Sequence, residues 1–469
     1  MRHRNIGGPT TRREALRAMG AGFGMVGLAG MLGETIQAAS PASMNPWTPR
    51  PPHFPARAKH VIFVFLNGGL SQVDSFDYKP ALKKYHGKPL PYETPRTEFA
   101  TGNLMETPFQ FQQYGENGTL VSELFPNIAG AVDEFCIIRS MQSDIPNHVP
   151  GVLMANTGFS QRGRPSMGSW IVYGLGTETQ NLPGFIVLSV NGRGEDGGRN
   201  ASTAAFLPAV YQGTPLSLQA GDPKKMIHYL SNPNMDLETQ REQLELIQRL
   251  NRLHLERTPG SPQLEATIQT METAFRMQME APDVLDIGKE SEETRKRYGA
   301  SPFSRACLMA RRMVERGVRF VQLNHGDWDH HADIMRHRDL SLEVDGPITT
   351  LVKDLKERGL LDETLVIVGT EFGRTPVVQL ASALHNGRDH NVHGFTWLLA
   401  GGGIKGGTIY GATDEFGFKV AENPVHIHDV HATILHLLGM DHERLTYHYS
   451  GRDFRLTDVE GRVVTDIIV

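Results

Sequence analysis

Cysteine is scarce in this sequence, which has only Cys136 and Cys307 among its 469 residues. Two isolated thiols exclude a framework of several disulfides and a zinc site built from four thiolates. Blocks of like charge are also missing, and the formal net charge is −5 at pH 7. Because a negatively charged chain binds a phosphate backbone poorly, we expect no nucleic-acid partner.

Long apolar runs are missing as well. The uncharged, Gly/Ala-rich stretch at residues 18–32 is too short to cross a bilayer core of about 30 Å. Arg12-Arg13 precede it, and small residues follow at 38–42. A basic start, a short apolar run and a small-residue exit are typical of a signal peptide, and the paired arginine favours the Tat route. The alternative is a buried N-terminal helix that follows a chance arginine pair.

These features predict the domain organisation of the chain. We expect a Tat signal peptide at residues 1–42, a Pro-rich linker at 43–59 and one α/β domain over 60–469. The protein is then exported to the periplasm or cell surface of a bacterium, with the Tat translocase as a partner during export. Without a long apolar run in the mature chain, it is not expected to be an integral membrane protein.

Short apolar segments rich in β-branched and aromatic residues alternate with helical segments. The segments expected to be strands are 60–66, 135–138, 185–190, 319–323, 365–368 and 396–400. The segments expected to be helices are 304–316, 340–358 and 429–438, each closing near a glycine. This alternation predicts an α/β fold in which helices sandwich a mostly parallel sheet. Residues of about 236–298 are charged and helical without a strand, which indicates a helical insertion.

Histidine is plentiful where cysteine is not, and 13 of the 20 histidines lie between His325 and His448. Ligands of open α/β sheets bind beyond the carboxyl ends of the strands, so the residues that follow each strand are the informative ones. Asp329 and His331 follow one strand and stand two apart, which projects both side chains to one side. Asp389-His390 stand ahead of the segment 396–400 and would supply a ligand and the carboxylate that orients it.

Imidazole and carboxylate side chains at several strand ends predict a divalent metal site. Zinc or manganese suits such ligands best, and calcium is possible. A second histidine group belongs to the C-terminal helix, where we expect structural roles for His426, His428, His431 and His436.

Several strings of this sequence resemble the alkaline-phosphatase superfamily, and more closely its Tat-exported domain-of-unknown-function family 1501. The resemblance covers the chain from about 60 to about 455. It is carried by the strings FLNGGLSQVD at 65–74, GRPSMGSW at 163–170, TEFGRTP at 370–376, GRDH at 387–390 and GGGIKGG at 401–407. It implies an alkaline-phosphatase-like fold and an enzyme of the phosphatase and sulfatase type with two adjacent metal positions.

The resemblance assigns one metal position well and the other poorly. Asp329, His331 (or His330) and His390 match the ligands of the first position. At the second, Asn67 stands where an aspartate is expected, and Glu371-Phe372 stand where Asp-His is expected. Glu371 and Asn67 would therefore line a weaker second position.

The residue that matches the superfamily's hydroxyl nucleophile is His148. Three roles are open for it: a nucleophile, a general base or extra metal ligand with water attacking, or none in a catalytically dead site. The second is our preferred hypothesis.

The sequence thus predicts an exported metal-dependent hydrolase acting on a sulfate or phosphate ester of a small molecule or polysaccharide. Arg374 or Arg388 would hold the anionic substrate, although a structural ion pair is as good an interpretation of either. The alternative function is a catalytically inactive cell-surface binding or structural protein that keeps the fold and one ion.

Overall fold

The structure is a computed structural model that describes residues 47–179, 181–190, 201–218, 281–380 and 386–469, with single positions and short runs between 226 and 250. The expected signal peptide at 1–42 and most of the linker at 43–59 lie outside the described residues. Most of the expected insertion at 236–298 also lies outside them. Its described end contains a short helix, α11 (Glu292–Tyr298).

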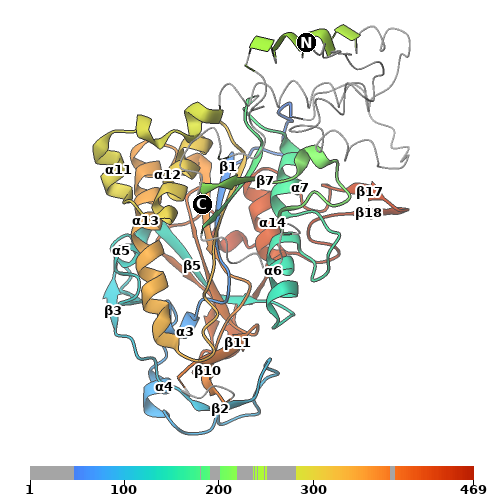
Figure 1. The fold of residues 1–469 in the computed structure, drawn as a ribbon. Helices are drawn as coiled ribbons and strands as arrows, with labels where there is room; N and C mark the ends of the chain where they lie inside the picture. Colours follow the sequence, from blue (N-terminus) through green and yellow to red (C-terminus); the bar gives the residue numbers. More distant parts are fainter. Residues whose placement is uncertain are drawn as a thin grey trace, which may run out of the picture.

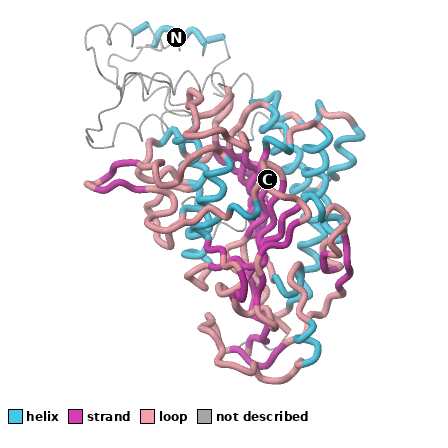
Figure 2. The backbone as a smooth tube through the Cα atoms, turned by 180° about the vertical axis from the view of Figure 1, so that it is seen from behind, coloured by secondary structure: helices cyan, strands magenta, loops and turns pink. Residues whose placement is uncertain are grey.

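Nine strands of the described chain form one large sheet, which lies at the centre of the molecule (Figures 1 and 2). Eight follow the order β13-β5-β12-β9-β1-β8-β6-β7, and β16 pairs with β5. Their bounds are β1 (His60–Leu66), β5 (Phe135–Gln142), β6 (Phe185–Val190), β7 (Thr214–Ser217), β8 (Phe320–His325), β9 (Thr364–Gly369), β12 (Phe395–Ala400), β13 (Thr408–Tyr410) and β16 (Val425–His426). All pairs are parallel except those of β12 with β9 and β5.

Helices cover both faces of this sheet (Figure 2). One face packs on α5 (Pro126–Ala129), α12 (Pro302–Glu315) and α13 (His337–Glu357), and the other on α6 (His148–Thr157), α7 (Met167–Leu175) and α14 (Ile427–Leu437). Strand β1 shows why two cores form. Ile62 and Val64 belong to the first and Phe63 and Phe65 to the second, because successive side chains of a strand point to opposite faces.

The six expected strands and three expected helices are all present, and the α/β class with a mostly parallel central sheet is confirmed. The sequence interpretation missed a second, three-stranded antiparallel sheet. It consists of β2 (Thr101–Leu104), β10 (Gly373–Gln379) and β11 (Arg388–Asn391). It lies at the lower end of the main sheet in Figure 1.

The direction of β12 decides which residues lie at the end of the main sheet where the second sheet is found. Because β12 runs antiparallel to β9, its first residue, Phe395, lies at the edge where the parallel strands finish. Residues just ahead of β12 therefore reach the same edge as residues that follow β1, β8 and β9. This places β11 beside the loops where ligands of such sheets bind.

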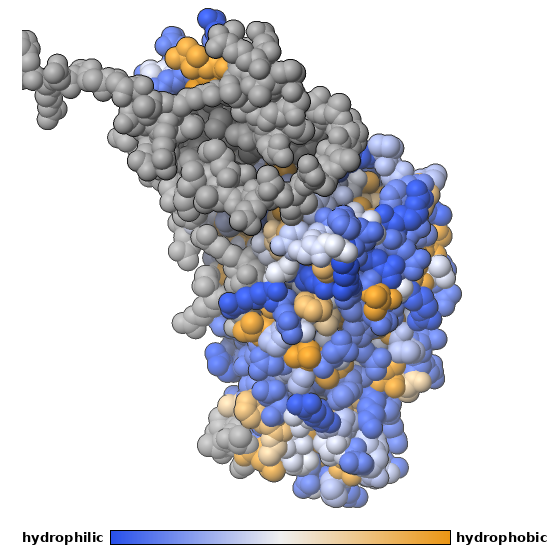
Figure 3. All heavy atoms as spheres, turned by 90° about the vertical axis from the view of Figure 1, so that its right-hand side faces the viewer, coloured by the Kyte–Doolittle hydropathy of each residue, from blue (hydrophilic) through white to orange (hydrophobic). Residues whose placement is uncertain are grey.

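No helix among the described residues is long and apolar enough to cross a bilayer. The described part of the face in Figure 3 is mostly hydrophilic, with hydrophobic residues scattered over it. That pattern is ordinary for a protein surface exposed to water.

Candidate metal centre

Four side chains from three segments of the chain converge at the carboxyl edge of the main sheet. His148 begins α6, Asp329 and His331 lie in the loop after β8, and His390 lies on β11. One ligand atom from each of the four lies within 4.8 Å of the others. Within the described ranges, no second group of three or more histidine, cysteine or acidic residues meets this distance. We call these four residues the tetrad.

Each imidazole of the tetrad is held by its Nδ1 atom. In every case Nδ1 contacts an oxygen acceptor and donates to it, which leaves Nε2 as the nitrogen that can bind an ion. The acceptors are Glu371 Oε1 for His148 at 2.9 Å, Gln379 Oε1 for His331 and the carbonyl of Pro146 for His390. Metal-binding histidines in proteins are oriented in this way.

The free nitrogens all face Asp329. Its Oδ1 lies 2.8 Å from Nε2 of His331 and 3.3 Å from Nε2 of His390, and its Oδ2 lies 3.2 Å from Nε2 of His148. Ligands about 2.0–2.1 Å from a tetrahedral zinc ion are about 3.3–3.4 Å apart, so two of the three separations already match. Nε2 of His148 is buried, and no described residue offers it a hydrogen bond of acceptable angle. These residues therefore fit a metal ion.

The electrostatics also favour a cation at this point. Burial would raise the pKa of Asp329, but the three imidazoles and the charge of Arg374 outweigh it and lower that pKa far below its usual range. Burial would lower the pKa of His148, but the neighbouring carboxylates of Asp329 and Glu371 raise it to about 9. Burial lowers the pKa of His390 to about 3. A proton on His148 thus supplies positive charge between the carboxylates of Asp329 and Glu371. A bound ion would take the place of that proton.

The tetrad is open to solvent on one side. The side chain of Asp329 is 40% exposed, that of His331 23% and that of His148 19%, whereas that of His390 is 3% exposed. The ring of Phe372 closes the inner side by stacking on His390, with centroids 4.3 Å apart. A ligand from solution can therefore approach from the side of Asp329.

Glycine lets the segment after β1 approach the tetrad. Gly68 has φ of +119°, and a Cβ there would lie 2.6 Å from the amide nitrogen of Asp329. The Gly68 amide donates to Glu371 Oε1 at 2.9 Å. Asn67, at the end of β1, is buried beside this contact, and its carbonyl accepts from the amide of Trp328.

Asn67 and Glu371 do not join the tetrad. Glu371 lies behind His148, where its carboxylate accepts hydrogen bonds from that imidazole, from Gly68 and from Thr370. The structure therefore gives Glu371 the position of an orienting group for His148. Asp389 also differs from the expectation. It accepts from the backbone amides of Phe99 and His390, while the ring of His390 is held by Pro146.

The two arginines expected to hold substrate are fully buried. Arg388 forms a two-pronged ion pair with Asp74 at 2.7 and 3.1 Å. Arg374 contacts Asp329 Oδ1 at 2.6 Å and four backbone carbonyls. Both arginines therefore form buried ion pairs, which is the alternative interpretation that the sequence left open.

Other histidines in the described part of the chain have protein partners away from the tetrad. His330, the alternative to His331, is not part of the tetrad, and its Nδ1 contacts Nδ1 of His337 at 2.6 Å. His428 and His431 donate from Nε2 to carbonyls at the end of α6, at 2.8 and 2.9 Å. These contacts agree with the structural roles expected for the C-terminal group.

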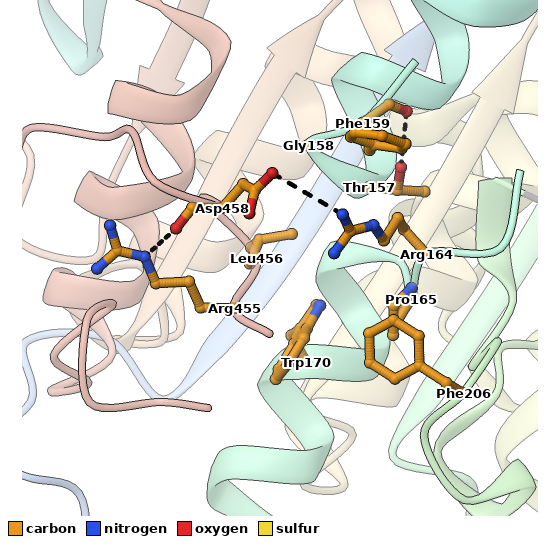
Figure 4. Close-up of a pocket in the computed structure, with 10 residues that line it drawn as sticks. All are labelled: Thr157, Gly158, Phe159, Arg164, Pro165, Trp170, Phe206, Arg455, Leu456 and Asp458. Atoms are coloured by element: carbon orange, nitrogen blue, oxygen red, sulfur yellow. Dashed lines mark hydrogen bonds and ion pairs between the residues drawn. The ribbon is translucent and has the colours of Figure 1, made fainter. Parts of the chain in front are cut away.

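A hollow at the far end of α6 is a poor alternative site. It is lined by Thr157, Arg164 and Asp458, among others (Figure 4). The guanidinium of Arg164 lies 4.5 Å from the ring centroid of Phe159 and 4.3 Å from that of Phe454. The walls leave no room for a water molecule, so this structure offers no space for a ligand there.

Sequence reasoning missed the groups that orient the imidazoles. Gln379 is 48 positions from His331 and lies on β10, and the acceptor for His390 is a backbone carbonyl. No spacing or motif marks either group, since both are brought close by strand pairing. The Glu371 side chain was noticed, but its role as the partner of His148 was not.

Glu371→Gln is expected to weaken divalent-metal binding by about 10–100-fold, the usual cost of losing a group that orients a ligand. Isothermal titration of the metal-free protein with zinc or manganese measures this. Glu343→Gln is the matched control, because Glu343 contacts buried His325 at 3.1 Å outside the tetrad. Equal affinities for the Glu371→Gln variant and the unaltered protein would contradict the orienting role.

Comparison with known proteins gave one family and a set of distant structures. The family described as "Protein of unknown function (DUF1501)" matches residues 58–468. No curated protein matches the chain. Similar solved structures include a phosphonate monoester hydrolase from Silicibacter pomeroyi, at 12% identity and TM-score 0.37, covering 87% of this chain and 76% of that one.

Two other similar structures are a sulfatase from Pseudoalteromonas sp. and the TAB5 alkaline phosphatase. The sulfatase is 14% identical with a TM-score of 0.34, covering 82% of this chain and 69% of that one. The phosphatase is 10% identical with a TM-score of 0.34, covering 82% of this chain and 99% of that one. At these scores the reaction has to be inferred from the geometry of the tetrad.

Proposed function

The chain belongs to the DUF1501 family of proteins of unknown function, and we propose that it is an exported metal-dependent hydrolase of a sulfate or phosphate ester. The observation that supports this most is the open tetrad. Three imidazoles whose Nε2 atoms face one carboxylate form a ligand set for a borderline divalent ion. The side chain of Asp329 is 40% exposed, so an ion held here would keep a further position open to water or substrate, which a closed structural zinc site lacks.

Zinc or manganese is the ion that we propose, since three nitrogen ligands suit either better than calcium, which takes oxygen ligands. The bound ion would polarise an ester oxygen and help to generate a nucleophile from water. His331, His390 and Asp329 would hold it, and Glu371 and Gln379 would keep two imidazoles in the binding orientation. The substrate would approach over the exposed edge of Asp329.

For His148 we propose the role of a fourth ligand. A nucleophilic nitrogen must reach the ester, and Nε2 of His148 is buried against Asp329. Its Nδ1 faces Glu371. The water that attacks would therefore come from the solvent side of the tetrad.

Metal analysis followed by activity measurement tests this function. We expect the mature protein to carry zinc or manganese, and to hydrolyse at least one ester from a panel of aryl sulfates, phosphomonoesters and phosphodiesters. Removal of the ion by a chelator should abolish turnover, and its return should restore it. His390→Ala should bind no ion, whereas His431→Gln, outside the tetrad, should keep both metal and activity.

Each contrary result has a definite meaning. A protein without a bound transition metal, even after incubation with excess ion, would refute the metal site. A protein that binds metal but hydrolyses no ester of the panel would support the alternative function, a surface binding protein that keeps one ion.

We also propose that residues 1–42 direct the chain through the Tat route to the periplasm or cell surface. A fractionation experiment with Arg12-Arg13 replaced by lysine would test this.

A further inference from the structure

The guanidinium of Arg374 joins two of the three segments that carry the tetrad, the loop after β8 and strand β11, to the loop after β1. The side chain is completely buried, and one of its terminal nitrogens lies 2.6 Å from Asp329 Oδ1. The other hydrogen bonds reach backbone carbonyls in the loops after β1 and β8 and in β11. Those carbonyls belong to Gly68, Gly69, Trp328 and Arg388. A fixed positive charge is therefore built in next to the exposed carboxylate of the site.

The residues around this charge do not fit a second divalent ion. Glu371 has its carboxylate engaged by three donors, from His148, Gly68 and Thr370. Asn67 has no charge. Phe372 cannot bind a metal, and its ring packs against His148 and His390, with centroids 5.0 and 4.3 Å away. The second metal position that the family resemblance implies is thus missing its ligands.

We propose that the site holds a single metal ion and that Arg374 supplies its second positive charge. This inference rests on the proposed function and specifies its metal centre. A guanidinium at this place can balance Asp329 and hold its carboxylate toward the three imidazoles. Unlike an ion, it cannot be lost to solution, so this half of the centre is permanently present.

The charges of the centre agree with one ion. Three carboxylates, those of Asp329, Glu371 and Asp389, lie in or against the tetrad and contribute −3 when ionised. One divalent ion and Arg374 contribute +2 and +1, so the sum is zero. Arg388 is balanced by Asp74 and adds nothing. A second divalent ion would leave +2 uncompensated in a partly buried site, which is strongly unfavourable.

Counting the ions on the full mature protein tests the proposal directly. After incubation with excess zinc or manganese and removal of free ion, native mass spectrometry should find one ion per chain. Two ions per chain, both lost in a His148→Ala variant, would overturn the single-ion centre while leaving the proposed hydrolase intact. No ion at all would overturn both.

Two substitutions separate charge from packing at Arg374. Arg374→Lys keeps the charge and is expected to bind one ion with an affinity within a few-fold of the original. Arg374→Gln keeps a donor but removes the charge that repels the ion, so its affinity should rise roughly tenfold or more. Equal losses of affinity in both variants would show that Arg374 only positions the loops, and would overturn its role as the second charge. Arg388→Lys, at the neighbouring buried ion pair, should leave the affinity unchanged. If the Arg374 variants do not fold, the ion count of the unaltered protein still decides.

Discussion

Asp329→Asn is expected to lower the affinity for zinc or manganese by more than about 100-fold and to reduce ester hydrolysis to background. Asp329 is the point at which all three imidazoles of the tetrad meet, at 2.8 to 3.3 Å, and it is also the ion-pair partner of Arg374. Asparagine has nearly the same shape, so the loop after β8 is kept while the charge is lost. Loss of a group that only orients a ligand lowers metal affinity by about 10–100-fold. Loss of a charged ligand itself should lower it by more.

The charge of Arg374 makes this effect larger. In the variant that buried guanidinium faces the site without a carboxylate to balance it, and it repels the incoming ion. Titration of the metal-free variant measures the affinity, and a chelator competition extends the range to tight binding. Turnover of the best ester of the panel is measured with excess ion.

Asp327→Asn is the matched control, because it makes the same chemical change two residues away. Asp327 has φ of +72°, a backbone conformation that asparagine tolerates well, and it lies outside the tetrad. The control should keep metal affinity and turnover. An Asp329→Asn variant that still binds the ion within tenfold of the original would show that the tetrad is not the metal site.

Arg311→Met is expected to lower the free energy of unfolding by about 3–5 kcal/mol, the usual cost of removing one partner from a buried ion network. Arg311, on α12, is 1% exposed at its side chain and lies 2.7 Å from Glu290 and 3.0 Å from Asp354 of α13. Glu290 and Asp354 are also largely buried. Without the arginine, both carboxylates lose a buried cationic partner inside a helical layer that covers one face of the main sheet, and of the described cations only Arg312 beside Glu290 and Arg358 beside Asp354 remain.

Denaturant unfolding of the metal-free protein measures this effect without any contribution from the ion. Arg297→Met is the matched control, because Arg297 forms a two-pronged pair with Glu357 at 2.7 and 2.8 Å on the surface. Exposed pairs contribute about 0–1 kcal/mol, so the control should be close to the original protein. Equal losses in the two variants would contradict the view that burial decides the energy of these pairs. Neither change should alter metal affinity.

The sequence was a good guide to the main sheet and to part of the tetrad. The buried strands are continuous apolar runs such as residues 60–66, and the helices carry their own periodicity and end signals, so both can be read from neighbouring residues. Asp329 and His331 could be paired because they are two apart in one loop. His390 was chosen for its place ahead of a strand, but its position at the site depends on β12 running antiparallel, which local sequence does not encode.

The roles of the polar residues were harder to predict than their presence. The sequence predicts that Glu371 lines a second, weaker metal position, and in the structure its carboxylate lies behind His148. Arg374 and Arg388 were candidates for substrate binding, and both are buried in ion pairs. Gln379 was not considered, because its contact with His331 exists only where β10 passes the loop after β8.

The scarcity of cysteine in the sequence by itself excluded a thiolate metal site, the histidines and aspartates that follow its strands indicated imidazole and carboxylate ligands, and its apolar runs determined an α/β fold. Those properties follow from composition and from short-range patterns, which a chain carries before it folds. Tertiary structure alone decided which four residues share a centre, which oxygen fixes each imidazole, and that a guanidinium stands beside Asp329. Such contacts join positions up to about 300 residues apart, and their geometry is set by strand direction and loop packing.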